Sequence, residues 1–132
     1  MDELIIGLFA FLGGCLRYGI DFGIPNVQGL PVATLLINIL GSFLLALLNT
    51  TWTVNEHIPA RLSLGLGTGM IGAFTTFSSF SLEIVALLAS GHYLLAGGYA
   101  ILSLSTGLFG ALLGFLLGKK LYPKGDIVHD DD

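Results

Sequence analysis

Charged residues are scarce in this chain. Of its 132 residues only 11% are charged, whereas 54% are hydrophobic. One small soluble core cannot bury that much apolar side chain, so the composition favours a protein dissolved in lipid. The few lysines and arginines form no basic surface, which excludes nucleic acid as a partner.

Cysteine is nearly absent as well, and the N-terminal segment has no cationic start. The single cysteine, Cys15, lies within an apolar run and can form no intrachain disulfide. The start Met1-Asp2-Glu3 lacks the positive charge of a secretory signal, and Arg17 interrupts the region where cleavage would occur. We therefore expect the first apolar segment to be retained as a helix.

Long apolar runs are what the sequence does contain. Four segments, roughly residues 4–22, 31–52, 60–89 and 93–118, approach or exceed the length of about 20 residues that spans a bilayer. Short polar breaks separate them, so neighbouring helices must be antiparallel. The sequence predicts an all-α membrane protein with a four-helix transmembrane domain over residues 1–122 and a polar, disordered tail over residues 123–132.

The cations are distributed unevenly between the two ends of this predicted bundle. Arg61, Lys119, Lys120 and Lys124 fall on the face that carries both termini, whereas the opposite face has at most Arg17. Cytoplasmic loops of membrane proteins are enriched in lysine and arginine. This bias predicts that both termini are cytoplasmic.

Residues 72–81, Gly-Ala-Phe-Thr-Thr-Phe-Ser-Ser-Phe-Ser, place five hydroxyl side chains at mid-membrane depth. Such a run favours a break in the third helix, and breaks persist only within protein or beside a water-lined cavity. Free carbonyls at a break can bind a cation, and free N–H groups favour an anion. A simple packing kink is the alternative.

Further polar and aromatic residues in the apolar segments are candidates for the same site. Phe77 and Phe80 present ring edges with partial positive charge, although phenylalanine more often fills space. A buried amide such as Asn38 either joins helices or lines a wet path. Glu83 is either functional or interfacial. Two sets of residues share helix faces by their spacing: Thr34, Asn38 and Ser42, and Tyr99, Ser103 and Thr106.

Three motifs resemble the Fluc (CrcB) family of fluoride channels. They are residues 13–18 (Gly-Gly-Cys-Leu-Arg-Tyr), residues 38–42 (Asn-Ile-Leu-Gly-Ser) and residues 72–81, within a match from residue 4 to about residue 120. The resemblance implies an antiparallel, dual-topology dimer in the cell membrane of a prokaryote, with two fluoride pores along the subunit interface. It also implies a structural sodium ion on the dimer axis.

Site residues follow from the resemblance by motif position. Asn38, Phe77 and Phe80 would line the pores, Thr34, Ser79 and Glu83 would form a polar track, and the backbone carbonyls of Gly72 and Thr75 would hold sodium. Ser103 is the hydroxyl candidate on the fourth helix, where this chain departs from the family by having Gly107 and Ala111. The uneven cations favour one orientation, so the partner is a second copy or an oppositely oriented paralogue.

The implied function is a passive, fluoride-selective channel that exports cytoplasmic fluoride and confers fluoride resistance. The alternative is a small dual-topology multidrug/proton antiporter, but that chemistry needs an acid within the first helix, and Glu3 is too near the terminus. We expect no enzyme activity, because the histidines fall in loops or the tail, away from Cys15.

Overall fold

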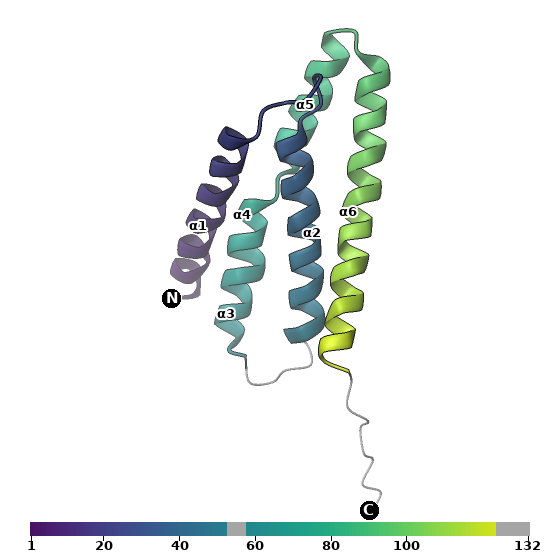
Figure 1. Ribbon diagram of the computed structural model, residues 1–132. Coiled ribbons are helices and arrows are strands. Elements are labelled where there is room, and N and C mark those ends of the chain that lie inside the picture. The colour runs from purple at the N-terminus through teal and green to yellow at the C-terminus, as the bar shows by residue number, and fades with distance from the viewer. Residues whose placement is uncertain (53–57, 124–132) are drawn as a thin grey trace, which may run out of the picture.

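Four long helical segments form the molecule, as a computed structural model shows for residues 1–52 and 58–123 (Figure 1). The segments are α1 (Asp2–Gly23), α2 (Val32–Trp52), an interrupted third segment (Ala60–Ala89) and α6 (Tyr93–Leu121). Each is long and apolar enough to cross a membrane. The predicted all-α membrane fold with four transmembrane helices is confirmed.

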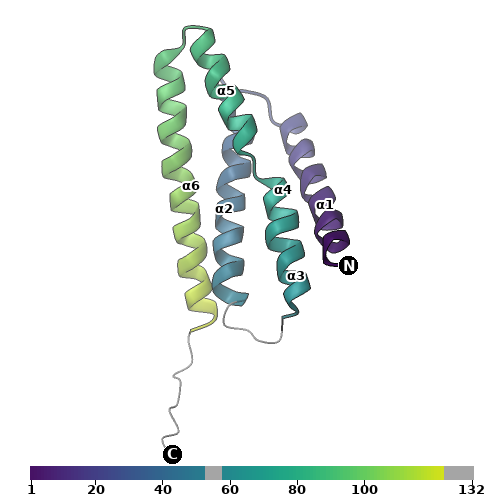
Figure 2. The same cartoon turned by 180° about the vertical axis from the view of Figure 1, so that it is seen from behind.

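The third segment is broken near its middle, as predicted. It consists of α3 (Ala60–Leu64), the π-helix η1 (Gly65–Ile71), the short α4 (Gly72–Phe74) and α5 (Phe77–Ala89). Between α4 and α5, Thr75 and Thr76 have extended backbone, with ψ values of 154° and 119°. Figures 1 and 2 show the chain stepping sideways at this point before α5 continues.

Helices α2 and α6 pack along their length, because glycines let their backbones meet closely. A Cβ atom on Gly110 would lie 2.8 Å from the carbonyl oxygen of Ile39. One on Gly114 would overlap the carbonyl of Phe43. The glycines that α6 turns toward α2, Gly110 and Gly114, therefore serve helix packing.

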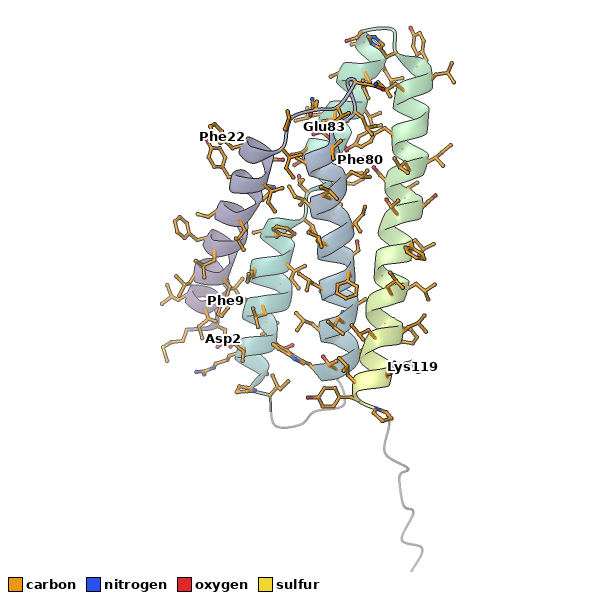
Figure 3. All side chains as sticks on the ribbon, in the orientation of Figure 1. Asp2, Phe9, Phe22, Phe80, Glu83 and Lys119 are labelled. Atoms are coloured by element: carbon orange, nitrogen blue, oxygen red, sulfur yellow. The ribbon has the colours of Figure 1, made fainter. Side chains whose placement is uncertain are left out.

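Helix α1 packs against η1 and α4, away from α6. Gly65 and Gly69 provide the close approach here, since a Cβ on Gly69 would lie 2.6 Å from the carbonyl oxygen of Ile6. The outer surface of the bundle is apolar, with Leu94 94% exposed and Phe22 85% exposed (Figure 3). Lipid is the solvent that suits such a surface.

The N-terminus and the end of α6 lie at the same end of the molecule (Figure 1). At that end Arg61 Nε pairs with an Asp2 carboxylate oxygen at 2.9 Å, and Lys119 Nζ lies 5.2 Å from the centre of the Phe115 ring. The predicted grouping of Arg61 and Lys119 with the termini is confirmed. Lys124 and the predicted disordered tail lie outside the described residues, apart from Pro123.

We predict that Gly110→Ala lowers the free energy of unfolding by about 1–3 kcal/mol, because the new methyl group presses on the α2 backbone. Unfolding in mixed detergent–SDS micelles, followed by circular dichroism, measures this. Gly97→Ala is the matched control on the same helix, since its methyl group meets open space. Equal stability of the two variants would contradict the close α2–α6 contact.

Candidate functional site

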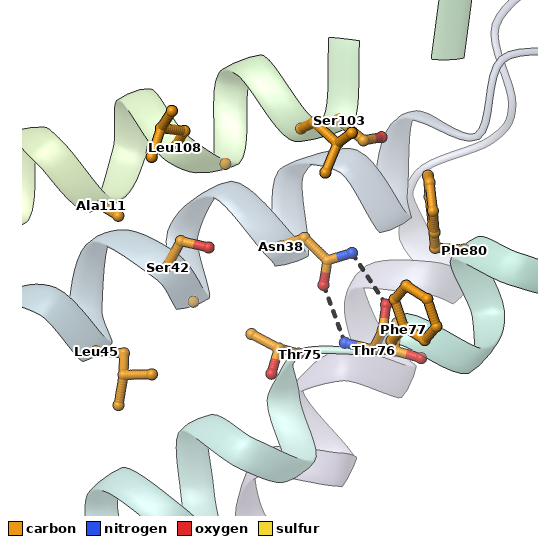
Figure 4. Close-up of a pocket in the computed structure, with 13 residues that line it drawn as sticks. Asn38, Ser42, Leu45, Thr75, Thr76, Phe77, Phe80, Ser103, Leu108 and Ala111 are labelled. Atoms are coloured by element: carbon orange, nitrogen blue, oxygen red, sulfur yellow. Dashed lines mark hydrogen bonds between the residues drawn. The ribbon is translucent and has the colours of Figure 1, made fainter. Parts of the chain in front are cut away.

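A groove of about 550 Å³ runs between α2, α6 and the break (Figure 4). None of the described residues that line it is charged. Its polar lining consists of an amide and a hydroxyl on α2, two threonines of the break and a serine on α6; the remaining lining residues are aromatic, aliphatic or glycine. The lining residues are Asn38, Gly41, Ser42, Leu45, Thr75, Thr76, Phe77, Phe80, Ser103, Leu104, Gly107, Leu108 and Ala111.

Asn38 bonds to both polar groups of the residue at the break. Its Nδ2 donates to the carbonyl oxygen of Thr76 at 3.0 Å, and the Thr76 amide donates to Asn38 Oδ1 at 2.9 Å (Figure 4). Extended backbone makes no helical hydrogen bonds, so a Thr76 amide or carbonyl left unbonded at this depth would cost free energy. Asn38 thus joins α2 to the break and also borders the groove.

The break continues into α5 through a side-chain cap. Thr76 Oγ1 accepts a hydrogen bond from the Ser79 amide at 3.1 Å, which is how threonine begins a helix. In an unbroken helix the amides of Thr76 and Ser79 would bond to the carbonyls of Gly72 and Thr75. Both amides donate to side chains instead. The two carbonyls predicted to hold sodium are therefore the ones whose helical donors are diverted.

Glu83 ties three helices together above the break. One carboxylate oxygen accepts from Thr34 Oγ1 at 2.6 Å and the other accepts from the Tyr99 hydroxyl at 2.7 Å. Thr34 is buried on α2, and Tyr99 is fully buried on α6. Glu83 thus lies within the bundle, bonded to hydroxyls from both neighbours. Its bond to Tyr99 is a partner that sequence reasoning missed, because spacing alone does not pair residues on different helices.

Aromatic rings continue from this cluster to the mouth of the groove. The Tyr99 and Phe80 ring centres are 5.3 Å apart, and those of Phe80 and Phe77 are 5.9 Å apart. Phe77 begins α5 directly after the break and is 79% exposed. The two phenylalanines therefore present ring edges and faces to the groove and to its open side.

The hydroxyls of α6 behave differently from one another. Thr106 Oγ1 donates to the carbonyl of Leu102 in its own helix at 2.6 Å. Ser103 Oγ, by contrast, is buried and has no hydrogen-bond partner within the described part of the chain. A buried hydroxyl without a partner is costly unless something else binds it. Ser103 borders the groove, so a molecule or ion in the groove could form the missing hydrogen bond.

The structure brings most of the predicted site residues together. Asn38, Phe77, Phe80 and Ser103 line the groove, and the Thr34–Glu83 pair lies next to it. The Thr75 side chain also faces the groove. Ser79 does not line the groove; its described contact is through its backbone amide. Ser42 and Thr76 complete the polar part of the lining. The polar stripe on α2 indicated Ser42, and the run of hydroxyls at residues 72–81 indicated Thr76.

Asn38→Ala should lower the free energy of unfolding by about 1–3 kcal/mol, because it leaves the Thr76 amide and carbonyl without partners. The same micelle titration measures this change. Thr106→Ala is the control, since that hydroxyl bonds only within its own helix and its loss should cost about 0.5 kcal/mol or less. A free energy of unfolding in Asn38→Ala equal to that of the wild type would show that the break does not depend on the amide.

The sequence matches the family described as CrcB-like protein, Camphor Resistance (CrcB), over residues 4–115. It is 39% identical to "Fluoride-specific ion channel FluC 2" of Listeria monocytogenes, a match that covers 96% of this chain and 97% of the relative. It is 40% identical to "Fluoride-specific ion channel FluC 1" of Bacillus cereus, covering 92% and 90%.

A relative from Methylobacterium, "Fluoride-specific ion channel FluC", is 38% identical over 89% of this chain and 95% of its own length. These similarities extend over all four spans and include the break and every residue that lines the groove. The chain is therefore a multi-pass protein of the cell membrane and belongs to the CrcB family.

Proposed function

We propose that this protein is a passive fluoride-selective ion channel and not an enzyme. The observation that carries the proposal is the groove at the break, lined by hydroxyls, an amide and two phenylalanines with no charged side chain among the described residues. Relatives that match nearly the whole chain are named as fluoride-specific ion channels. A groove of this chemistry at mid-span is what conduction of a small anion needs.

Fluoride is small and strongly hydrated, so a pore must replace its water with hydrogen-bond donors. Hydroxyls, the Asn38 amide and the edges of Phe77 and Phe80 supply partial positive charge without a full cation that would trap the ion. Several weak positions allow the ion to leave as well as to enter. Because transport is passive, the inside-negative membrane potential drives fluoride out of the cell and confers resistance.

A second subunit would complete the pore. The groove is open on the side of Phe77, and lipid tails would enter it if a single chain stood alone. An antiparallel partner places its own break at the same depth, because the break lies near the middle of the span. The partner is a second copy or an oppositely oriented paralogue; several relatives carry the numbers 1 and 2 in their names.

The carbonyls of Gly72 and Thr75 would hold a structural sodium ion at the axis of such a dimer. Their helical donors are diverted to side chains, and unwound carbonyls are ligands that suit sodium. The described residues include no group of three or more histidine, cysteine or acidic side chains that could bind a metal instead. Bound sodium would supply positive charge that offsets the carbonyl dipoles where two subunits meet.

The antiporter alternative lacks support in the residues. Proton-coupled exchange of cationic drugs needs an acid inside the first span, whereas the acids of α1 are Asp2, Glu3 and Asp21, all near its ends. Glu83 is embedded, but its carboxylate is bonded to two hydroxyls. The named relatives are channels.

Fluoride efflux from liposomes tests the function. Purified protein in vesicles loaded with fluoride should release it rapidly once valinomycin balances charge, as read by a fluoride electrode. A parallel chloride electrode should record no comparable release. No fluoride release, both from the single protein and after co-expression with a paralogue, would contradict the channel.

The matched variants in the same assay are Phe80→Ile and Phe109→Ile. Phe80 borders the groove, whereas Phe109 is exposed on α6 and does not line it. Phe80→Ile should suppress fluoride release because it removes a ring edge, and Phe109→Ile should leave it unchanged. Equal release from both variants would remove Phe80 from the pathway.

Sodium should stabilise the folded protein if it binds at the break. Transfer from choline chloride to sodium chloride at a hundred times the dissociation constant should raise the free energy of unfolding by about 2.7 kcal/mol. Thermal unfolding in detergent at matched ionic strength measures this, with potassium chloride as the ion control. Identical unfolding temperatures in sodium and choline would contradict a sodium site.

A further inference from the structure

Two hydroxyls that line the groove have no hydrogen-bond partner in the described part of the chain, and one of them lies on α2. In the break, Thr75 Oγ1 donates to the Ile71 carbonyl and Thr76 Oγ1 accepts from the Ser79 amide. Ser103 Oγ has no hydrogen-bond partner within residues 1–52 and 58–123. Within the same residues Ser42 likewise makes no side-chain hydrogen bond.

The behaviour of Ser42 is unusual for a helical hydroxyl in lipid. Serine and threonine in such helices commonly bond to the carbonyl four residues earlier, as Thr50, Thr51 and Thr106 do here. Ser42 instead borders the groove, and its oxygen lies on the side of α2 that faces Gly107 of α6 (Figure 4). Its donor is therefore available to whatever occupies the groove.

Gly107 on α6 is the reason that this space is open. A Cβ atom at position 107 would lie 3.8 Å from Ser42 Oγ, which is ordinary contact, and the rest of a larger side chain would cover the hydroxyl. Ala111, one helical turn further, also lines the groove with a small side chain. The α6 wall thus offers Ser103 as its one hydroxyl among the described lining residues, and the others are apolar (Leu104, Gly107, Leu108 and Ala111), so the next donor comes from α2.

We propose that the Ser42 hydroxyl is a fluoride-contacting donor of this pathway and that glycine at position 107 exposes it. The proposal rests on the proposed function and deepens it. Ser42 follows Asn38 by one helical turn and lies further along the groove than Phe80 (Figure 4). An ion that leaves the phenylalanine pair therefore meets Ser103 from α6 and Ser42 from α2.

Fluoride efflux from liposomes, compared among three variants, tests the proposal. Ser42→Ala should slow fluoride release about tenfold, the usual effect of losing a hydrogen bond to a charged partner. Adding Gly107→Ser to Ser42→Ala should restore most of the rate, because a serine at 107 places a hydroxyl within reach of the same position. Ser105→Ala is the control, since Ser105 is exposed on α6 and does not line the groove.

The outcomes separate this inference from the function on which it rests. Wild-type release with an unchanged rate in Ser42→Ala would overturn the role of Ser42 and leave the channel intact. A slower fluoride release from Ser42→Ala that Gly107→Ser does not restore would also overturn it. A second hydroxyl can replace a missing hydrogen-bond donor, but it cannot repair damaged packing. Absence of release from the wild type would overturn the proposed function itself, and this inference with it.

Discussion

The two hydrogen bonds between the Asn38 amide and the backbone of Thr76 hold the centre of the molecule together. A helix cannot be interrupted in lipid unless its freed amide and carbonyl find partners, and one asparagine side chain supplies both an acceptor and a donor. With that pair in place, Thr76 is free to begin a new helix, and its own hydroxyl bonds to the Ser79 amide.

The break has consequences on two sides of the chain. On one side the carbonyls of Gly72 and Thr75 lose their helical donors, which makes them available as cation ligands. On the other side Phe77 and Phe80 begin a helix that leans against α6, where Tyr99 packs on Phe80 and donates to Glu83. The rest of the fold supports this arrangement, because the glycines of α6 bring it close to α2 and so define the groove wall.

The sequence predicted the elements better than the contacts between them. Hydropathy and length were enough for four spans, and the run of hydroxyls at residues 72–81 marked the break. The bonds of Asn38 to Thr76 and of Tyr99 to Glu83 were not predictable from spacing, because these partners lie 38 and 16 residues apart along the chain. Such contacts depend on the rotation and tilt of each helix, which spacing does not specify.

Ser79 illustrates the same limit within one helix. The family resemblance placed it in a polar track with Thr34 and Glu83, whereas in the structure its backbone amide donates to the residue that caps α5. Ser42 is the reverse case, since it belonged to a polar stripe with no assigned role and yet borders the groove without a hydrogen-bond partner among the described residues. Only the three-dimensional structure shows which hydroxyls donate to carbonyls of their own helix and which remain available to a ligand.

Current through the purified protein in a planar bilayer, with a fluoride gradient and equal chloride on both sides, tests the central claim most directly. A passive pathway selective for fluoride predicts a reversal potential at the fluoride equilibrium value, unaffected by a pH difference across the membrane. A reversal potential that follows chloride or the proton gradient would contradict the account.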